Sequence, residues 1–559
     1  MTERAEVVGP MATELNQRTE RSTGLWILIQ VLMIGLGAYY LTSIAKPDHT
    51  DADIIVGTLA GLHNLTLFFW DQDRLANLTA LLVSPFHSIG TAIYAYTAVQ
   101  ATYFSGLVFI LCGLLHPRRS TRLIAFIATI AILGQWIPDK QLYVFAKHAQ
   151  PYAASTLAVL AAYVLPLKVK QRLGCIAGQS GLMLTALLLN PLSGFLALTL
   201  PLSSVILCRN KQRNHAIGAA AKWTGVVIST ALGTRWIQEI YRQQMNVVAT
   251  PLALNPGQIP EGLGVAWERL FKSYDDQIVA LVMLGLMITY AMAFWIRESP
   301  LIGHNRISRK ENDSGTVVGW AITLNVISTL VIASSEWVQA FGYPLRYFFP
   351  IYLLAMTACV KTTGDVVTVV QNLMNHHPQS QRLLQILLGV LGSALLITGF
   401  NLQAQPIAPP LATYKQIRRI QPVFDYLEQN KLQSSVIGGN FGLSWSLYAY
   451  SLEQNRPIPT VSGRSTFDPA SQAQHQAFAE QIQSGQPIDF YCLQRRDNDP
   501  KSCEDWVQHK IHHHSPNNLN WTVSTSKEIT FASDGKRPTT LLKLRSEPQQ
   551  TTDPITSDT

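Results

Sequence analysis

Charged residues are scarce in this chain. Asp, Glu, Lys and Arg make up 14% of its 559 residues, whereas 48% are hydrophobic. Soluble domains carry about 25% charged residues, so this composition excludes an ordinary soluble protein and indicates a membrane protein. The net charge of +8 does not indicate nucleic-acid binding, because Lys and Arg collect in short clusters between apolar runs instead of forming one basic face.

Cysteine is also rare, and six in the whole chain exclude a disulfide-rich scaffold. Four of them lie in apolar runs, where we interpret them as small buried hydrophobic residues: Cys112, Cys175, Cys208 and Cys359. The other two, Cys492 and Cys503, lie in polar sequence and could form a disulfide in an oxidising compartment.

Several functional motifs are absent from the sequence. There is no GxGxxG or GxxxxGK[ST] pattern, which argues against a nucleotide site, and we interpret Gly438-Gly439 as a turn after a strand. The adjacent residues His512, His513 and His514 lack the spacing with which helical side chains converge on one metal ion. The membrane region shows no matching pair of broken spans, which weakens a transporter interpretation.

Long apolar runs are abundant. A bilayer core about 30 Å thick needs about 20 apolar residues per helix. Eleven segments qualify, approximately at 24–44, 86–116, 122–138, 150–167, 173–189, 191–208, 215–234, 277–296, 316–336, 344–360 and 384–400. The first is too long for a signal peptide, so we interpret it as a membrane anchor. The sequence therefore predicts a polytopic α-helical membrane domain over residues 24–400.

The distribution of Lys and Arg predicts the topology. With residues 1–23 as a cytoplasmic tail, every predicted cytoplasmic connection is basic, as the positive-inside rule requires. Loops 45–85, 139–150 and 235–276 are then external, and so is the polar region after the eleventh span. In this region we predict strands in "SSVIGGNF", "PIDFYCLQ" and "TTLLKLR" and helices in "FDYLEQN" and "HQAFAEQIQSG". Such alternation is typical of a small α/β domain, here over 401–545. Residues 546–559 have the composition of a disordered tail.

Acidic residues gather in the first external loop, in the stretch "KPDHTDADIIVG". We predict that Asp48 is a helix N-cap with Asp51 in the first turn. Asp51 and Asp53 are two positions apart and do not share a helical face, but at an irregular junction both could line one cleft. The alternative is that they are solvated loop acids.

A second polar group follows in the same loop, in "NLTLFFWDQDR". Its apolar start and polar end predict a helix in the membrane interface, with Trp70 at the headgroup level and Arg74 available to a phosphate. Asp71 and Asp73 in this stretch are secondary candidates for the site.

A third feature, "GYPLRYFFPIYLL", begins the tenth predicted span. Arg346 at this position should reach the interface or pair with an anion, and its guanidinium can hold a phosphate with two parallel hydrogen bonds. The alternative is an interfacial anchor supported by Tyr347.

Together, the acidic first loop, the long loop after the seventh span, the "RYF-P" segment and the soluble domain after the last span resemble the GT-C superfamily. These integral membrane glycosyltransferases include protein O-mannosyltransferases, lipid A aminoarabinose transferases and oligosaccharyltransferases. The resemblance covers about residues 20–400. It implies that Asp51 or Asp53 is the catalytic base or a metal ligand and that Arg346 contacts a lipid-linked phosphate. Many members carry Asp-Glu where this chain has Asp-Ala-Asp, so the choice of base stays open.

The resemblance predicts transfer of a sugar from a polyprenyl-phosphate donor to a lipid, glycan or protein acceptor at the periplasmic face of a bacterial inner membrane. A carboxylate would take the acceptor proton, and Arg346, Tyr347 and Arg74 would bind the donor phosphate. Asp51 and Asp53 could also hold Mg²⁺ or Mn²⁺, although the resemblance does not require a metal. The alternatives are a transporter, flippase or polymerase-like carrier of lipid-linked glycans, and a non-enzymatic membrane protein with an external sensor domain.

Overall fold

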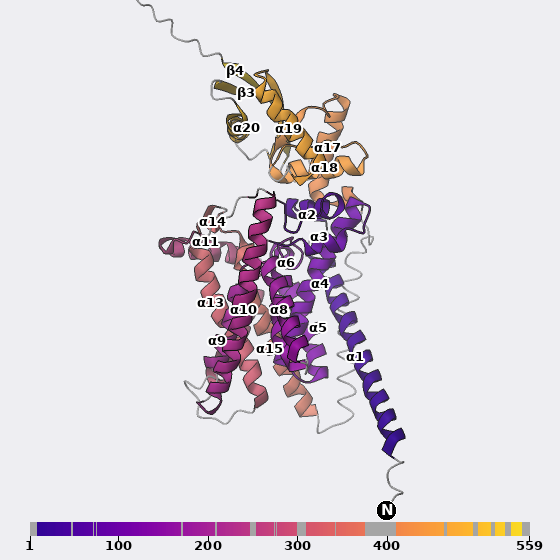
Figure 1. Cartoon of the computed structure of the whole chain (residues 1–559), viewed down its shortest axis with the longest axis vertical. Coiled ribbons are helices and arrows are strands. Elements are labelled where there is room, and N and C mark those ends of the chain that lie inside the picture. The colour runs from indigo at the N-terminus through magenta and orange to yellow at the C-terminus, as the bar shows by residue number, and fades with distance from the viewer. Residues whose placement is uncertain are drawn as a thin grey trace, which may run out of the picture.

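The computed structural model consists of a helix bundle with a smaller α/β domain at one end (Figure 1). It describes residues 8–45, 48–70, 72–73, 75–168, 172–206, 210–245, 247, 253–272, 274–275, 277–298, 309–340, 342–374, 410–462, 467–495, 501–515, 520–531 and 538–549. The core of the bundle is built from apolar side chains of its long helices.

A helix occupies each of the first ten predicted apolar segments. These helices are α1 (Val8–Ile44), α4 (Ile89–Leu115), α5 (Arg119–Trp136), α7 (Tyr152–Lys168), α8 (Arg172–Leu189), α9 (Ser193–Ile206), α10 (Asn210–Met245), α12 (Ile278–Glu298), α13 (Arg309–Ala333) and α15 (Phe349–Met374). Two of them run well past the predicted ends, α10 beyond residue 234 and α15 beyond residue 360.

Among the described residues, six helical segments are long and apolar enough to cross a membrane. They are Gly24–Ile44, Ile89–Leu115, Ala216–Met245, Ile278–Arg297, Ser314–Ala333 and Leu345–Leu373. The chain is therefore a polytopic helical protein with the features of an integral membrane protein. Eleven spans are not shown: α5, α7, α8 and α9 are shorter or less apolar, and segment 384–400 lies outside the described residues.

Short helices gather at the end of the bundle that faces the α/β domain (Figure 1). They are α2 (Ala52–His63), α3 (Leu78–Val83), α6 (Asp139–Ala146), α11 (Ile259–Lys272) and α14 (Glu336–Ala340), with 3-10 turns η1 (Pro256–Gln258) and η2 (Leu345–Phe348). Most of α2 is buried. Its small residues make this possible, since a Cβ on Gly57 would lie 2.8 Å from the Tyr96 ring and one on Gly61 would lie 2.4 Å from the Ala80 carbonyl oxygen.

The α/β domain contains one four-stranded sheet. Its elements are η3 (Leu411–Thr413), α17 (Lys415–Gln429), β1 (Val436–Gly439), α18 (Phe441–Glu453), α19 (Pro469–Gln483), β2 (Ile488–Arg495), α20 (Lys501–His514), β3 (Asn520–Phe531) and β4 (Thr539–Gln549). The strand order is β1-β2-β4-β3, with β1 parallel to β2 and the other pairs antiparallel. The predicted strands and helices are present, and the sequence interpretation missed α18, α20 and β3.

The double glycine Gly438-Gly439 does not form the predicted turn after a strand, because both residues belong to the end of β1 and pair with Cys492 and Leu493 of β2. Gly439 has a backbone φ of +109°, which residues other than glycine rarely adopt. A Cβ at this position would lie 2.5 Å from the Leu493 carbonyl oxygen. His512 lies on α20 with its side chain exposed.

The α/β domain packs directly on the first predicted external loop. α18 contacts α2, and the Trp70 ring lies 5.8 Å from the Trp445 ring at the centre of a shared apolar cluster. Trp70 is fully buried, so the prediction that it lies at the headgroup level is wrong. Its stretch is also irregular, not a helix, because the Phe68–Ala76 bridge folds it back on itself.

Polar contacts reinforce this interface at both ends of α2. On the N-terminal side, the backbone N–H of Lys415 donates to the Asp48 carbonyl oxygen at 2.8 Å, and the Arg418 guanidinium lies 3.6 Å from the Asp48 carboxylate. At the C-terminal end, His63 Nδ1 lies 3.3 Å from Asp468 Oδ1. The α/β domain and the loop that carries the acidic stretch therefore form one packed unit.

The disulfide between Cys492 and Cys503 is present, as the sequence predicted, and joins β2 to α20.

We expect a Cys492→Ala, Cys503→Ala double variant to lower the free energy of unfolding of the α/β domain by about 2–3 kcal/mol, because the crosslink restricts the unfolded chain. Hydrogen exchange of β2 and α20 in the full chain measures this loss. Cys175→Ala, a free cysteine in α8, is the control; unchanged protection in the double variant would contradict the expectation.

The Asp468 side chain provides a second test. Burial raises its pKa, but hydrogen bonds from His63, the Ser471 backbone and Tyr448 outweigh this, so its pKa lies below the usual value. Its stabilising contribution is therefore complete above the unfolded pKa of about 4 and fades as the pH falls below it.

We expect Asp468→Ala to destabilise the interface by about 1–3 kcal/mol at neutral pH, seen as faster hydrogen exchange at the C-terminal end of α2. The control is Asp489→Ala, since Asp489 is an exposed acid on β2 whose partner is Lys543. Equal exchange in both variants would mean that Asp468 does not hold the interface.

Candidate functional site

The N-terminus of α2 positions both acids of the Asp-Ala-Asp motif. Asp51 is the N-cap of α2: its backbone is extended, and its Oδ1 accepts a hydrogen bond from the Ile54 backbone N–H at 2.9 Å. Asp53 lies in the first turn. The prediction that Asp48 caps this helix is wrong, because the helix begins three residues later and the Asp48 side chain instead faces Arg418.

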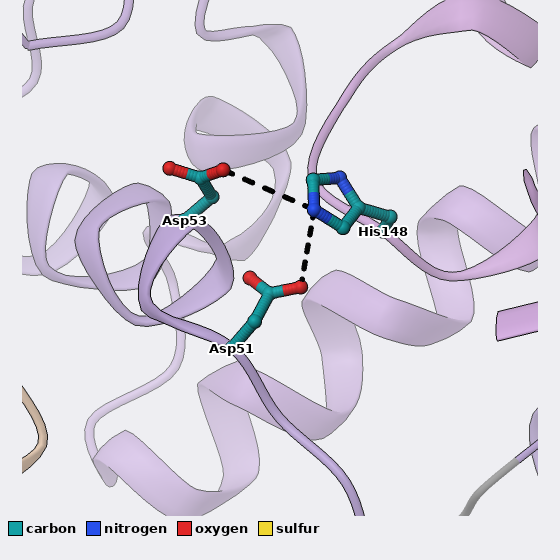
Figure 2. A group of neighbouring side chains, drawn as sticks. All are labelled: Asp51, Asp53 and His148. Carbon is teal, nitrogen blue, oxygen red and sulfur yellow. Dashed lines mark ion pairs between the residues drawn. The ribbon is translucent and has the colours of Figure 1, made fainter. Parts of the chain in front are cut away.

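A second segment, the end of α6, approaches these acids from the other side. Tyr143 Oη donates to Asp51 Oδ2 at 2.9 Å. Figure 2 shows His148 facing both carboxylates, with its Nε2 3.3 Å from Asp51 Oδ2 and 3.9 Å from Asp53 Oδ2. Burial and the negative charge of Asp51 raise the pKa of Tyr143 well above its usual value, so Tyr143 remains a hydrogen-bond donor at neutral pH.

The backbone N–H of Gln150 determines which ring nitrogen of His148 carries the hydrogen. The Gln150 backbone N–H donates to His148 Nδ1 at 3.2 Å, so Nδ1 must be unprotonated. In the neutral imidazole the hydrogen is then on Nε2, directed at Asp51 and Asp53.

Lys147 anchors the same segment to the end of α1. Its Nζ donates to the carbonyl oxygens of Thr42 and Ala45 at 3.1 and 3.0 Å, which satisfies acceptors left open where the helix ends. The side chain is almost completely buried, and this burial lowers its pKa to about 7, while the nearby negative charge of Asp48 opposes the change. Lys147 therefore holds His148 close to the segment that carries the acids.

Arg346 enters the site from a third segment. It lies in η2, and its Nη1 is 3.7 Å from Asp53 Oδ2. Aromatic packing explains this approach, because Phe145 on α6 stacks on Tyr352 of α15 with ring centroids 3.7 Å apart. The Arg346 guanidinium lies 5.3 Å from the centre of the Tyr347 ring. Its buried Nε has no hydrogen-bond partner among the described residues, which leaves one donor of the guanidinium fork unused.

Asp53 also lines a narrow crevice of about 10 Å³, which is room for about one water molecule. Asn77, Thr79 and Tyr96 contribute to its wall, and so does the stretch from Ala149 to Pro151 that follows His148. Asp51 does not line it. Of the two acids, Asp53 is the one that both faces Arg346 and lines this crevice.

Asp73, the described residue of the second acidic group, is not part of the site. Asp73 is buried and forms an ion pair with Arg242 near the end of α10, with Asp73 Oδ2 2.6 Å from Arg242 Nε. Asp71 and Arg74 lie outside the described residues.

The three side chains in Figure 2 could hold a metal ion. Asp51, Asp53 and His148 offer one ligand atom each, and these atoms lie within 4.8 Å of one another. Two oxygens and one imidazole nitrogen suit several divalent cations. The bond from Gln150 opposes this use of His148, since metal binding at Nε2 would require the ring hydrogen to move to Nδ1 and that bond to break.

Sequence reasoning predicted Asp51, Asp53 and Arg346 but missed Tyr143, Lys147 and His148. The latter three lie between residues 139 and 150, which the topology prediction placed in a short loop on the same side of the membrane as the acids. That shared side was the only available signal, because no motif spacing connects these residues to residue 51 or 53.

No protein-family model matches this chain, and no curated protein matches it.

A Tyr143→Phe variant tests how firmly α6 holds Asp51. Loss of a hydrogen bond to a carboxylate should lower the free energy of unfolding by about 1.5–3 kcal/mol, measured as a lower midpoint of thermal unfolding in detergent. The control is Tyr343→Phe, because the buried Tyr343 hydroxyl has no hydrogen-bond partner among the described residues. If both substitutions shift the midpoint equally, the Tyr143–Asp51 bond does not stabilise the site.

Proposed function

We propose that the chain is a membrane glycosyltransferase that moves a sugar from a polyprenyl-phosphate donor to an acceptor hydroxyl. The observation that carries this proposal is the approach of Arg346 to Asp53, with 3.7 Å between Nη1 and Oδ2. A base next to a phosphate-binding cation is what this transfer requires, since a proton leaves the acceptor as negative charge develops on the departing phosphate. The sequence resemblance to the GT-C superfamily points to the same reaction.

In this proposal the two acids have different roles. Asp51 accepts hydrogen bonds from Ile54 and Tyr143 and faces the Nε2 of His148, so its oxygens are used to hold α2 and the His148 segment. Asp53 borders the crevice and is the better candidate to take the proton from the acceptor. Asp51 is then a positioning residue, and His148 orients both carboxylates.

Arg346 is proposed to bind the donor phosphate. A phosphate that enters beside Asp53 could receive hydrogen bonds from two nitrogens of the guanidinium, including the Nε that lacks a partner among the described residues. Tyr347 packs against the guanidinium and would limit its movement. Arg74 could contribute a second cation, since its position in "NLTLFFWDQDR" makes it available to a phosphate.

The reaction does not require a divalent cation in this proposal. The hydrogen that His148 directs at the acids and the positive charge of Arg346 beside Asp53 both make a cation less favourable there. If Mg²⁺ or Mn²⁺ did bind, Asp51, Asp53 and His148 would be its ligands.

The packing of the α/β domain on the loop of α2 supports placing both on the same face of the membrane. We infer that this face is external, because the predicted connections at the other face are basic. In a bacterial inner membrane the external face is the periplasmic side. The acceptor, a lipid, a glycan or a protein, would approach from this side.

One observation bears on the transporter alternative. The late span contains an ion pair of the buried Lys361 with the partly exposed Asp365, and intramembrane charges are typical of transport pathways. However, His116 at the end of α4 contacts the Val360 carbonyl oxygen at 3.0 Å. This contact places the pair level with the end of α4, although the candidate span Leu345–Leu373 continues past it.

Substitution of Asp53 tests the proposal directly. We expect Asp53→Asn to lower the rate of transfer from polyprenyl-phosphate-linked sugars about 10²–10⁴-fold in membrane vesicles that contain native acceptors, because the general base is lost. Asp51→Asn should cost less, since the amide oxygen can still cap α2. The matched control is Asp139→Asn, an exposed acid in the first turn of α6.

Arg346→Ala should weaken binding of decaprenyl phosphate to the purified protein, and Arg346→Lys should restore part of it, since lysine keeps the charge without the fork. Full transfer by Asp53→Asn, or unchanged phosphate binding by Arg346→Ala, would refute the assigned roles. Loss of transfer on chelation, with recovery on addition of Mg²⁺, would assign a metal to the Asp51–Asp53–His148 group instead.

A further inference from the structure

An open groove of about 450 Å³ lies between the loop that follows α2 and the C-terminal end of α10. Leu65 and Leu67 line it from the loop, and Ile237, Ile240 and Met245 line it from α10. Both leucines are about half exposed although the rest of this loop is largely buried. Exposed leucines beside a cavity of this size indicate an apolar ligand or surface that covers them.

The groove continues the membrane-facing surface of α10. Only 17% of the most apolar window of this span is buried inside the protein, so most of its surface would face lipid. Leu232, Trp236 and Ile240 are all exposed and are spaced four residues apart, which places them on one stripe of the helix that ends in the groove. In a bilayer this stripe is covered by hydrocarbon chains, and the groove is where such a chain would leave the bilayer and enter the protein.

The chemistry of the lining favours hydrocarbon over a charged ligand. The described residues that line the groove include no charged side chain, and the polar ones, such as Asn64, Thr66 and Gln244, are neutral. The groove shares no lining residue with the crevice at Asp53, and Arg346 is not among its residues. It therefore lacks the cation that a lipid-linked donor phosphate would need.

We propose that this groove is a binding site for an acyl chain of a membrane phospholipid, with the headgroup at the bilayer surface. The chain fills the space between the loop and α10 and so joins the loop after α2 to the lipid-facing side of the bundle. This site does not depend on the glycosyltransferase proposal, since it uses none of the residues assigned to the reaction.

The test uses the full chain in nanodiscs of phosphatidylcholine that carries a photoactivatable diazirine on one acyl chain. Irradiation and peptide mapping should show labelling of residues 64–67 and 237–245. Ile240→Trp, which fills the groove, should lower this labelling roughly fivefold, because the contact area for the chain is lost. The control is Leu232→Trp, the same enlargement on the same stripe outside the groove, which should leave the labelling unchanged.

Leu67→Gln keeps the test informative if Ile240→Trp fails to elute as a folded protein, because Leu67 is half exposed and its polar replacement does not disturb the core. It should also reduce labelling. Wild-type labelling in both groove variants would overturn the proposal. Displacement of the phospholipid probe by an equimolar amount of decaprenyl phosphate would overturn it as well, since the groove would then belong to a polyprenyl lipid.

Discussion

Two carboxylates at the edge of an apolar helix bundle must be matched by hydrogen-bond donors and positive charge, and much of the architecture around α2 supplies them. A half-buried carboxylate without partners would destabilise the fold by several kcal/mol or become protonated. Here Asp51 accepts from its own helix and from Tyr143, and Asp53 faces Arg346 and His148. Donors from three separate parts of the chain thus meet at one helix end, and this meeting creates the candidate site.

The short helix α6 is the element that makes these donors converge. Its end carries Tyr143, and Lys147 and His148 follow directly after it. Each of the three contacts the segment around the end of α1 and the start of α2. Phe145 on the same helix stacks on Tyr352 and so brings the start of α15 close. Because one rigid helix touches both neighbours, the distance between Asp53 and Arg346 depends on aromatic packing that includes neither residue.

The α/β domain contributes to the same arrangement from the other side. It covers α2 through α18 and holds the segment before it through Asp48, which pairs with Arg418. The burial of α2 therefore requires a domain that lies more than 350 residues later in the chain. This dependence gives the domain a structural role in the site, whether or not it also binds the acceptor.

Local patterns in the sequence were sufficient to locate most helices of the bundle, the strands β1, β2 and β4, and the Cys492–Cys503 disulfide, since hydrophobic period and length act over short distances. They also identified Asp51, Asp53 and Arg346 as polar residues that are costly to leave unpaired next to apolar runs. They could not determine which aspartate caps α2. Aspartate is a common N-cap residue at either position, and only the structure shows that Asp51 accepts the capping hydrogen bond from the Ile54 backbone N–H. Nor could they place His148 beside the acids or bury Trp70 against Trp445, because those contacts join residues about 95 and 375 positions apart and exist only after the bundle and the α/β domain have packed.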